Sequence, residues 1–186
     1  MSTFTGALRA GSHLWLAMEG KYKGDTITVD AKNKPAFAYP DPDNIWVKIE
    51  AVIGVDPSSD EEEITASRPN AKALIEPYDK EIISSEQKYT FDLESYDAIL
   101  HGIQFRTKAD QEGVYVRGSN PAQNGWMHWQ AVNKHGEVVK VVEEYCSFKV
   151  TAGKWDGKDF IKPTLEATAL SSPHQVGIFN PEGITG

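Results

Sequence analysis

EYCSFKVTAGKWDGKDFIKPTLEATAL, residues 144–170, combines two alternating segments with a turn-rich loop between them. Apolar residues occupy every second position: Cys146, Phe148 and Val150 in the first segment, then Ile161, Leu165, Ala167 and Ala169 in the second. A period of two is typical of strands with one buried face. We therefore predict a hairpin here, and this hairpin carries neither a catalytic pairing nor a metal-ligand cluster.

The same alternation recurs along most of the chain. Strands are predicted in SHLWLAME (12–19), IWVKIEAVIG (45–54) and EQKYTFDLES (86–95), and with weaker patterns in DTITVD (25–30), EEEITAS (61–67), GWMHWQAVN (125–133) and GEVVKVVEEY (136–145). In residues 45–54 we expect one continuous strand with Ile49 between Val47 and Ile53 on a single apolar face. In residues 86–95 we expect Tyr89 and Phe91 to face the core.

One segment has helical rather than strand spacing. In SYDAILHGIQF, residues 95–105, the apolar side chains recur at intervals of three and four. Ser95 is the predicted N-cap, and Gly102 is predicted to end the helix after about two turns. Long loops are predicted at 21–44 and 106–125. The predicted fold class is mainly β, a β-sandwich or barrel with one short α-helix and long loops.

Length and composition indicate one soluble domain over residues 1–186. The chain is 40% hydrophobic and 25% charged, which is ordinary for a globular protein. Its single cysteine, Cys146, excludes an internal disulfide and is predicted to be a core residue. We see no secretory signal and no apolar run long enough to span a bilayer. The net charge of -8 disfavours a protein that grips nucleic acid.

Pro163 lies inside the last strong alternating segment. Proline has no N–H to donate, so it is confined to edge strands, strand starts and bulges. We predict that this strand is an edge at Pro163, or that its neighbour there belongs to another chain.

Candidate chemical sites are weak. His135 and Glu137 have an H-x-E spacing but lack the cysteine pair of a zinc deaminase, so a polar turn is the simpler interpretation. Two acidic runs, 41–44 and 56–63, could offer oxygens to calcium, but they lack the pattern of an EF-hand loop, and we interpret the second as a solvated acidic turn. The sequence therefore predicts no cofactor, no metal site and no enzymatic activity.

The order of elements resembles the tail tube (major tail) proteins of long-tailed bacteriophages, which are related to type VI secretion inner tubes. Three stretches carry the resemblance: LRAGSHLWLA (8–17), YTFDLESYDAILHGI (89–103) and the terminal residues 125–170. The resemblance implies a β-sandwich or barrel flanked by a helix. It also implies rings of six copies whose inner strands join into one barrel, and rings that stack through long loops and terminal arms.

What the resemblance implies about function is structural. The chain would be a virion protein of the tail, assembled in the host cytoplasm, whose partners are itself and other tail proteins but no membrane. Genomic DNA would pass through the bore without specific binding, because an acidic bore repels phosphates. Glu50, Asp92 and Glu94 alternate outward from core-facing strands, and they are our candidates for that acidic face.

Two alternatives remain open on the sequence. One is a carbohydrate-binding β-sandwich that uses Trp126, Trp155 and Tyr115 as a stacking platform. The other is a small enzyme on a β-barrel, with His128 and Glu137 as its first candidate residues.

Overall fold

The computed structural model describes residues 11–69, 75–105, 109–111, 114–115, 123–133, 135–151, 162–174 and 176–179. Within them the fold is mainly β with one helix, as predicted. The strands are β1 (Gly11–Met18), β2 (Gly20–Tyr22), β3 (Ile27–Val29), β4 (Val47–Ile49), β5 (Val52–Pro69), β6 (Ile75–Leu93), β7 (Ala109–Gln111), β8 (Val114–Tyr115), β9 (Asn124–Val132), β10 (Val138–Thr151), β11 (Thr164–Ala169) and β12 (Val176–Phe179), and the helix is α1 (Ala98–Phe105).

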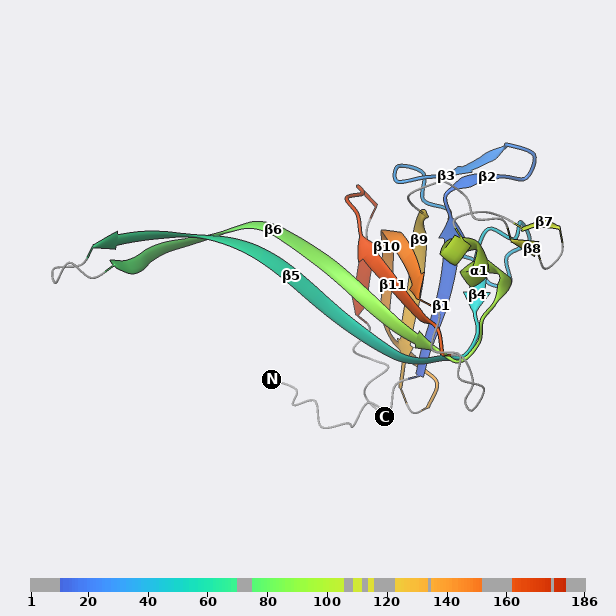
Figure 1. Cartoon of the computed structure of the whole chain (residues 1–186). Helices are drawn as coiled ribbons and strands as arrows, with labels where there is room; N and C mark the ends of the chain where they lie inside the picture. Colours follow the sequence, from blue (N-terminus) through green and yellow to red (C-terminus); the bar gives the residue numbers. More distant parts are fainter. Residues whose placement is uncertain are drawn as a thin grey trace.

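One antiparallel sheet dominates the molecule (Figure 1). Its strand order is β4-β1-β9-β10-β11-β6-β5, and β12 also pairs with β10. The hairpin predicted in residues 144–170 is confirmed, because β10 and β11 pair from Cys146 opposite Ala169 to Thr151 opposite Thr164. The strands β2 and β3 form a small hairpin of their own, as do β7 and β8. The described strands do not close into a barrel.

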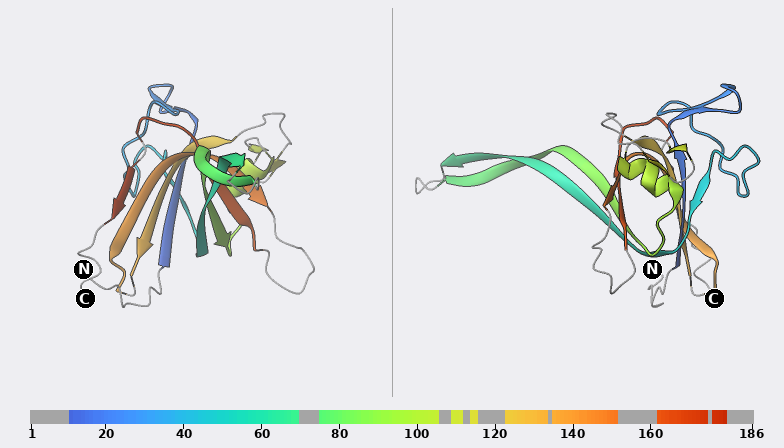
Figure 2. Two further views of the ribbon diagram at one scale, coloured as in Figure 1. Left: turned by 90° about the vertical axis from the view of Figure 1, so that its left-hand side faces the viewer. Right: turned by 45° about the vertical axis from the view of Figure 1, so that its right-hand side comes forward.

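The two ends of this sheet are joined by a link of two residues, Glu50 and Ala51. β4 and β5 are the outermost strands in the pairing order, yet only this link separates them in sequence. The sheet must therefore curl until its ends meet (Figure 2). Ala51 has a positive φ of 55°, which turns the chain from one end of the sheet to the other.

Hydrogen bonds attach the link to the segment that leads into α1. The amide of Glu94 donates to the carbonyl of Ala51 at 3.0 Å, and the hydroxyl of Ser95 donates to the carbonyl of Glu50 at 2.9 Å. The amide of Glu50 donates to a carboxylate oxygen of Asp97 at 3.4 Å. The link consequently fixes the start of α1 as well as the curl of the sheet.

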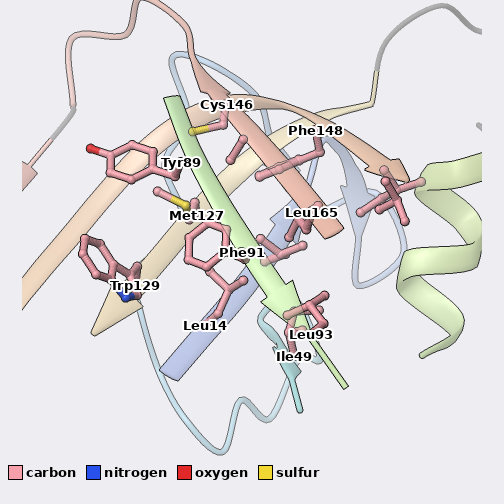
Figure 3. Close-up of a cluster of buried hydrophobic side chains, with 14 of the residues drawn as sticks. Leu14, Ile49, Tyr89, Phe91, Leu93, Met127, Trp129, Cys146, Phe148 and Leu165 are labelled. Carbon is pink, nitrogen blue, oxygen red and sulfur yellow. The ribbon is translucent and has the colours of Figure 1, made fainter. Parts of the chain in front are cut away.

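The inner face of the curled sheet holds the main hydrophobic core. Tyr89, Phe91 and Leu93 of β6 are all buried there, as their alternation predicts. Cys146 and Phe148 of β10 join them, and Figure 3 shows these side chains converging with Met127, Trp129 and Leu165. Leu100 and Ile103 of α1 complete this inner core.

A second cluster of buried side chains covers part of the outer face. It lies beneath the segment between β2 and β4 and consists of Trp15, Ala17, Val29, Ile45, Trp46, Trp126 and Tyr145. The indole N–H of Trp126 donates to the carbonyl of Asp30 at 2.9 Å, and that of Trp46 donates to the carbonyl of Ala36 at 3.0 Å. This outer cluster fixes the irregular residues 31–46 onto β1 and β9.

β5 and β6 extend far beyond the body of the molecule (Figure 1). They pair from Val52 opposite Leu93 to Pro69 opposite Ile75, whereas β11 pairs with β6 only as far as Lys88. We call residues 59–69 and 75–87 the ribbon. The interpretation of residues 56–63 as an acidic turn is wrong, because they lie within β5 and pair along β6.

The continuous strand predicted over residues 45–54 is also wrong. The chain breaks at the Glu50–Ala51 link, and a bulge follows between Val52 and Gly54. Together these features interrupt the alternation. Val47 is 39% exposed and Ile53 is 53% exposed, while Ile49 between them is buried.

Two smaller predictions on the helix fail. The helix begins at Ala98, where the carbonyl of Asp97 accepts the amides of Leu100 and His101, so Ser95 is not its N-cap. It also continues through Gly102 to Phe105. Packing of Ile103 into the inner core outweighs the helix cost of glycine, which is about 1 kcal/mol.

The expectation of an edge at Pro163 is wrong too. β11 starts at Thr164 and is paired with β10 on one side and β6 on the other. Pro163 is fully buried just before the strand, and its carbonyl accepts the amide of Leu93 at 3.0 Å. A strand start needs no N–H from the proline, so the position is compatible with a central strand.

We expect Ala51→Val to destabilise the protein by about 1–2 kcal/mol, because a β-branched residue scarcely tolerates the left-handed region. Ala51→Gly is the matched control and should lose no stability, since glycine adopts positive φ freely. Urea unfolding of the three proteins measures the difference. Equal stability of the valine and glycine variants would contradict the assigned role of the link.

Candidate assembly surfaces

Over β6, β11, the start of β5 and the second half of β10, the described outward side chains are polar and are half-buried or exposed. We call this the polar face, and its members are Asp56, Lys88, Thr90, Asp92, Ser147, Lys149, Thr151, Thr164, Glu166 and Thr168. The pairing register brings them into rows: Thr90 lies between Asp56 and Glu166, and Thr164 lies between Asp92 and Thr151. An antiparallel sheet can leave one face in water in this way.

The three carboxylates predicted for an acidic face lie at one end of the sheet. Asp92 is exposed on the polar face opposite Gly54. Glu50 and Glu94 are exposed on either side of the hydrogen bond that joins Glu94 to Ala51. Glu50 also forms an ion pair of 3.2 Å with Lys48. The structure therefore gathers the three residues around the link.

The ribbon is the largest unsupported feature of the described chain. Among the described strands, β5 pairs only with β6, and residues 75–87 of β6 pair only with β5. Two strands without a third are marginally stable in water, and free strand edges invite pairing with other chains.

The ribbon, with the adjoining residues 56–58, also carries most of the net negative charge of the protein. Residues 56–87 contain nine Asp or Glu and three Lys or Arg, so they contribute -6 to the net charge of -8. In the backbone register Asp60 lies directly opposite Glu86, and like charges at such positions destabilise a strand pair.

A buried polar cluster lies at the outer cluster's rim. His128 is only 4% exposed, its ring stacks on Phe37 at 3.4 Å between centroids, and its Nδ1–H donates to Glu143 at 2.6 Å. Lys34 forms an ion pair with the other carboxylate oxygen of Glu143. Burial, with the nearby charge of Lys34, lowers the pKa of His128 to about 4. His128 is thus a neutral residue that holds residues 34–37 onto the sheet.

This cluster is not the pairing expected for an enzyme. The partner of His128 is Glu143, whereas Glu137 is exposed in the turn after β9, where its carboxylate accepts the side-chain amide of Asn133 at 2.8 Å. Cys146 is fully buried, and burial raises the pKa of its thiol, so it is unsuited to nucleophilic chemistry. It belongs to the core, as predicted.

The aromatic platform expected for carbohydrate binding is not formed by Trp126. Its side chain is fully buried in the outer cluster, where it cannot stack on a sugar. Trp155 lies outside the described residues, as does the side chain of Tyr115. Nothing in the sequence indicated that residues 31–46 cover Trp126.

Two further searches were limited to the described part of the chain. There, no group of three or more His, Cys, Asp or Glu side chains gathers to hold a metal ion. No helix found there is long and apolar enough to cross a membrane.

We expect stability to fall by about 2 kcal/mol between pH 7 and pH 5 through His128 alone. The unfolded chain takes up the proton near the ordinary pKa of histidine, while the folded chain resists protonation until about pH 4. Urea unfolding at both pH values measures this loss. His128→Gln has no such group, so its stability should depend less on pH by that amount. An identical pH dependence in the two proteins would contradict the burial of a neutral His128.

No protein-family model matches the sequence, and no curated protein matches it. Several solved structures align with the fold, and three of them are described here. They are a cryo-EM structure of the anti-feeding prophage baseplate (11% identity, TM-score 0.46, 97% of this chain and 99% of that chain), the sheath-tube complex of an extracellular contractile injection system in its extended state (9%, 0.40, 89% and 88%), and the cap that terminates the anti-feeding prophage tube (10%, 0.37, 78% and 95%). At these identities and TM-scores the likenesses establish no function.

Proposed function

We propose that this chain is a structural subunit of a phage-tail-like tube, and that its copies assemble into stacked rings of six through which DNA passes. The observation that carries the assembly role is the ribbon, which has no support within the described chain. Rings of six are what the resemblance of the sequence to tail tube proteins implies, and they do not depend on pairing between ribbons. A chain that extends two long strands into solvent leaves backbone donors and acceptors for another chain to satisfy. Its function is therefore assembly.

The inner core allows the body of the subunit to fold before the ribbon contacts another chain. The inner core buries Phe91, Leu93 and Leu100 completely, so we expect the body to fold without help from the ribbon. The ribbon then offers surface for contacts with other chains and does not stabilise the body. In the tail of a particle its contacts would be other copies or other tail proteins, with no cofactor required.

The polar face supplies a surface suited to a bore. We place Glu50, Asp92 and Glu94 toward the lumen, where a ring of six would repeat each carboxylate six times. Double-stranded DNA carries one charge per ~1.7 Å of its axis, so a basic lining would trap it and an acidic lining lets it pass. The Thr and Ser side chains of the polar face add hydroxyls, and its two lysines, Lys88 and Lys149, form ion pairs with Glu86 and Glu166.

The first test is assembly of the purified protein. We expect negative-stain microscopy at high concentration to show rings or stacked tubes, with a matching large species in sedimentation velocity. Small uniform monomers at every concentration and salt condition would refute the proposal.

The second test concerns the lumen. Rings of the variant Glu50→Lys, Asp92→Lys, Glu94→Lys should retain linear double-stranded DNA and protect it from nuclease, and the retention should weaken steeply with salt. Rings of the unaltered protein should retain none. The control variant Glu61→Lys, Glu62→Lys, Glu63→Lys makes the same change in charge on the ribbon and should give no nuclease protection. Protection by both variants, or by neither, would place the three carboxylates outside the lumen.

A further inference from the structure

The free edge of β5 is strongly acidic where it leaves the body. Asp56 and Asp60 to Glu63 place five carboxylates within eight consecutive residues of one strand. Across the ribbon, Asp60 pairs in register with Glu86, and Lys88 already forms an ion pair of 2.9 Å with Glu86. The ribbon therefore does not balance its own charge, and whatever lies against this edge must bring positive charge.

A second copy of this chain offers little free positive charge in the part that the structure describes. The described lysines are largely paired with carboxylates of their own chain: Lys21 with Asp25, Lys23 with Asp43, Lys34 with Glu143, Lys48 with Glu50 and Lys149 with Glu166. Two ribbons side by side would bring identical acidic runs together, which is unfavourable. Within the described residues, charge thus disfavours a second copy as the occupant of this edge.

We propose that the edge of β5 along residues 58–63 receives an extended segment rich in lysine or arginine from a different protein, added as a further strand of the sheet. Strand addition satisfies the free main-chain groups of β5 and converts the two-stranded ribbon into a three-stranded sheet. The basic side chains of the added strand neutralise the carboxylates of residues 60–63. The inference deepens the proposed assembly role and rests on it only for the premise that the ribbon is an assembly arm.

The probe for this proposal is a ten-residue peptide of alternating lysine and threonine, labelled for fluorescence anisotropy. Its matched control has the same sequence with N-methyl groups on alternate residues, which keep every charge but remove backbone donors. We expect the full chain to bind the first peptide at least tenfold more tightly than the second. Charge attraction alone binds both equally, and that result would overturn strand addition.

Two protein variants locate the site. Glu61→Gln, Glu62→Gln, Glu63→Gln should lower the affinity for the unmethylated peptide at least tenfold. Glu50→Gln, Asp92→Asn, Glu94→Gln removes the same charge from the body and should change the affinity less than twofold. If both variants lost the same affinity for the peptide, the peptide would bind by overall charge and not at a site on β5. Exposed substitutions of this kind typically change stability by less than about 0.5 kcal/mol, and thermal unfolding of each variant checks that it is folded.

Ring formation separates this inference from the proposed function. The ribbon variant should form the same rings as the unaltered chain, because its partner is another protein. If that variant loses both the rings and the peptide, a second copy occupies the edge and the inference is wrong. A chain that binds the peptide through β5 but never forms rings would keep the inference and refute the tube.

Discussion

The short link at Glu50 and Ala51 is the constraint on which the rest of the structure depends. It joins the two outermost strands of the sheet, so the sheet can satisfy it only by curling. The curl encloses the inner core, and the bonds from the link to Glu94 and Ser95 place α1 against that core. The same geometry directs β5 and β6 outward, because β11 accompanies β6 only to Lys88. Body and ribbon are thus two consequences of one connection.

Curling also divides the outer face into two parts with different surfaces. Over β1 and β9, residues 31–46 cover an aromatic cluster and are held by Asp30, Trp126 and the pair of Lys34 with Glu143. Over β6 and β11 the described residues form no such cluster, and the outward residues are threonines and charged side chains. One half of the sheet is therefore buried on both faces, and the other half is buried on one face. The pattern of buried and exposed residues must change between the two halves. β10 shows this change, because Tyr145 is buried in the outer cluster whereas Lys149 is exposed.

Local alternation predicted much of the body, since a half-buried strand shows its pattern in a few consecutive residues. Tyr89, Phe91 and Cys146 lie where that pattern places them. It could not reveal the break at Ala51, because alanine gives no sign of a positive φ and the apolar alternation runs on through it. It also mistook residues 56–63 for a turn, since a run of polar and acidic residues has no apolar alternation to detect. The gathering of Glu50 and Glu94 depends on a long-range pairing that sequence spacing does not encode.

The distribution of charge gives the free subunit a way to remain soluble while it carries open strand edges. Long free edges aggregate unless something keeps like edges apart, and charged side chains are one of the means that natural proteins use. Here the acidic run lies on β5, whose outer edge pairs with none of the described strands, so we expect two ribbons to repel each other in water. Salt weakens that repulsion over about 8 Å at physiological ionic strength. The carboxylates that protect the edge from its own copies are therefore the same groups that would select a basic partner for it.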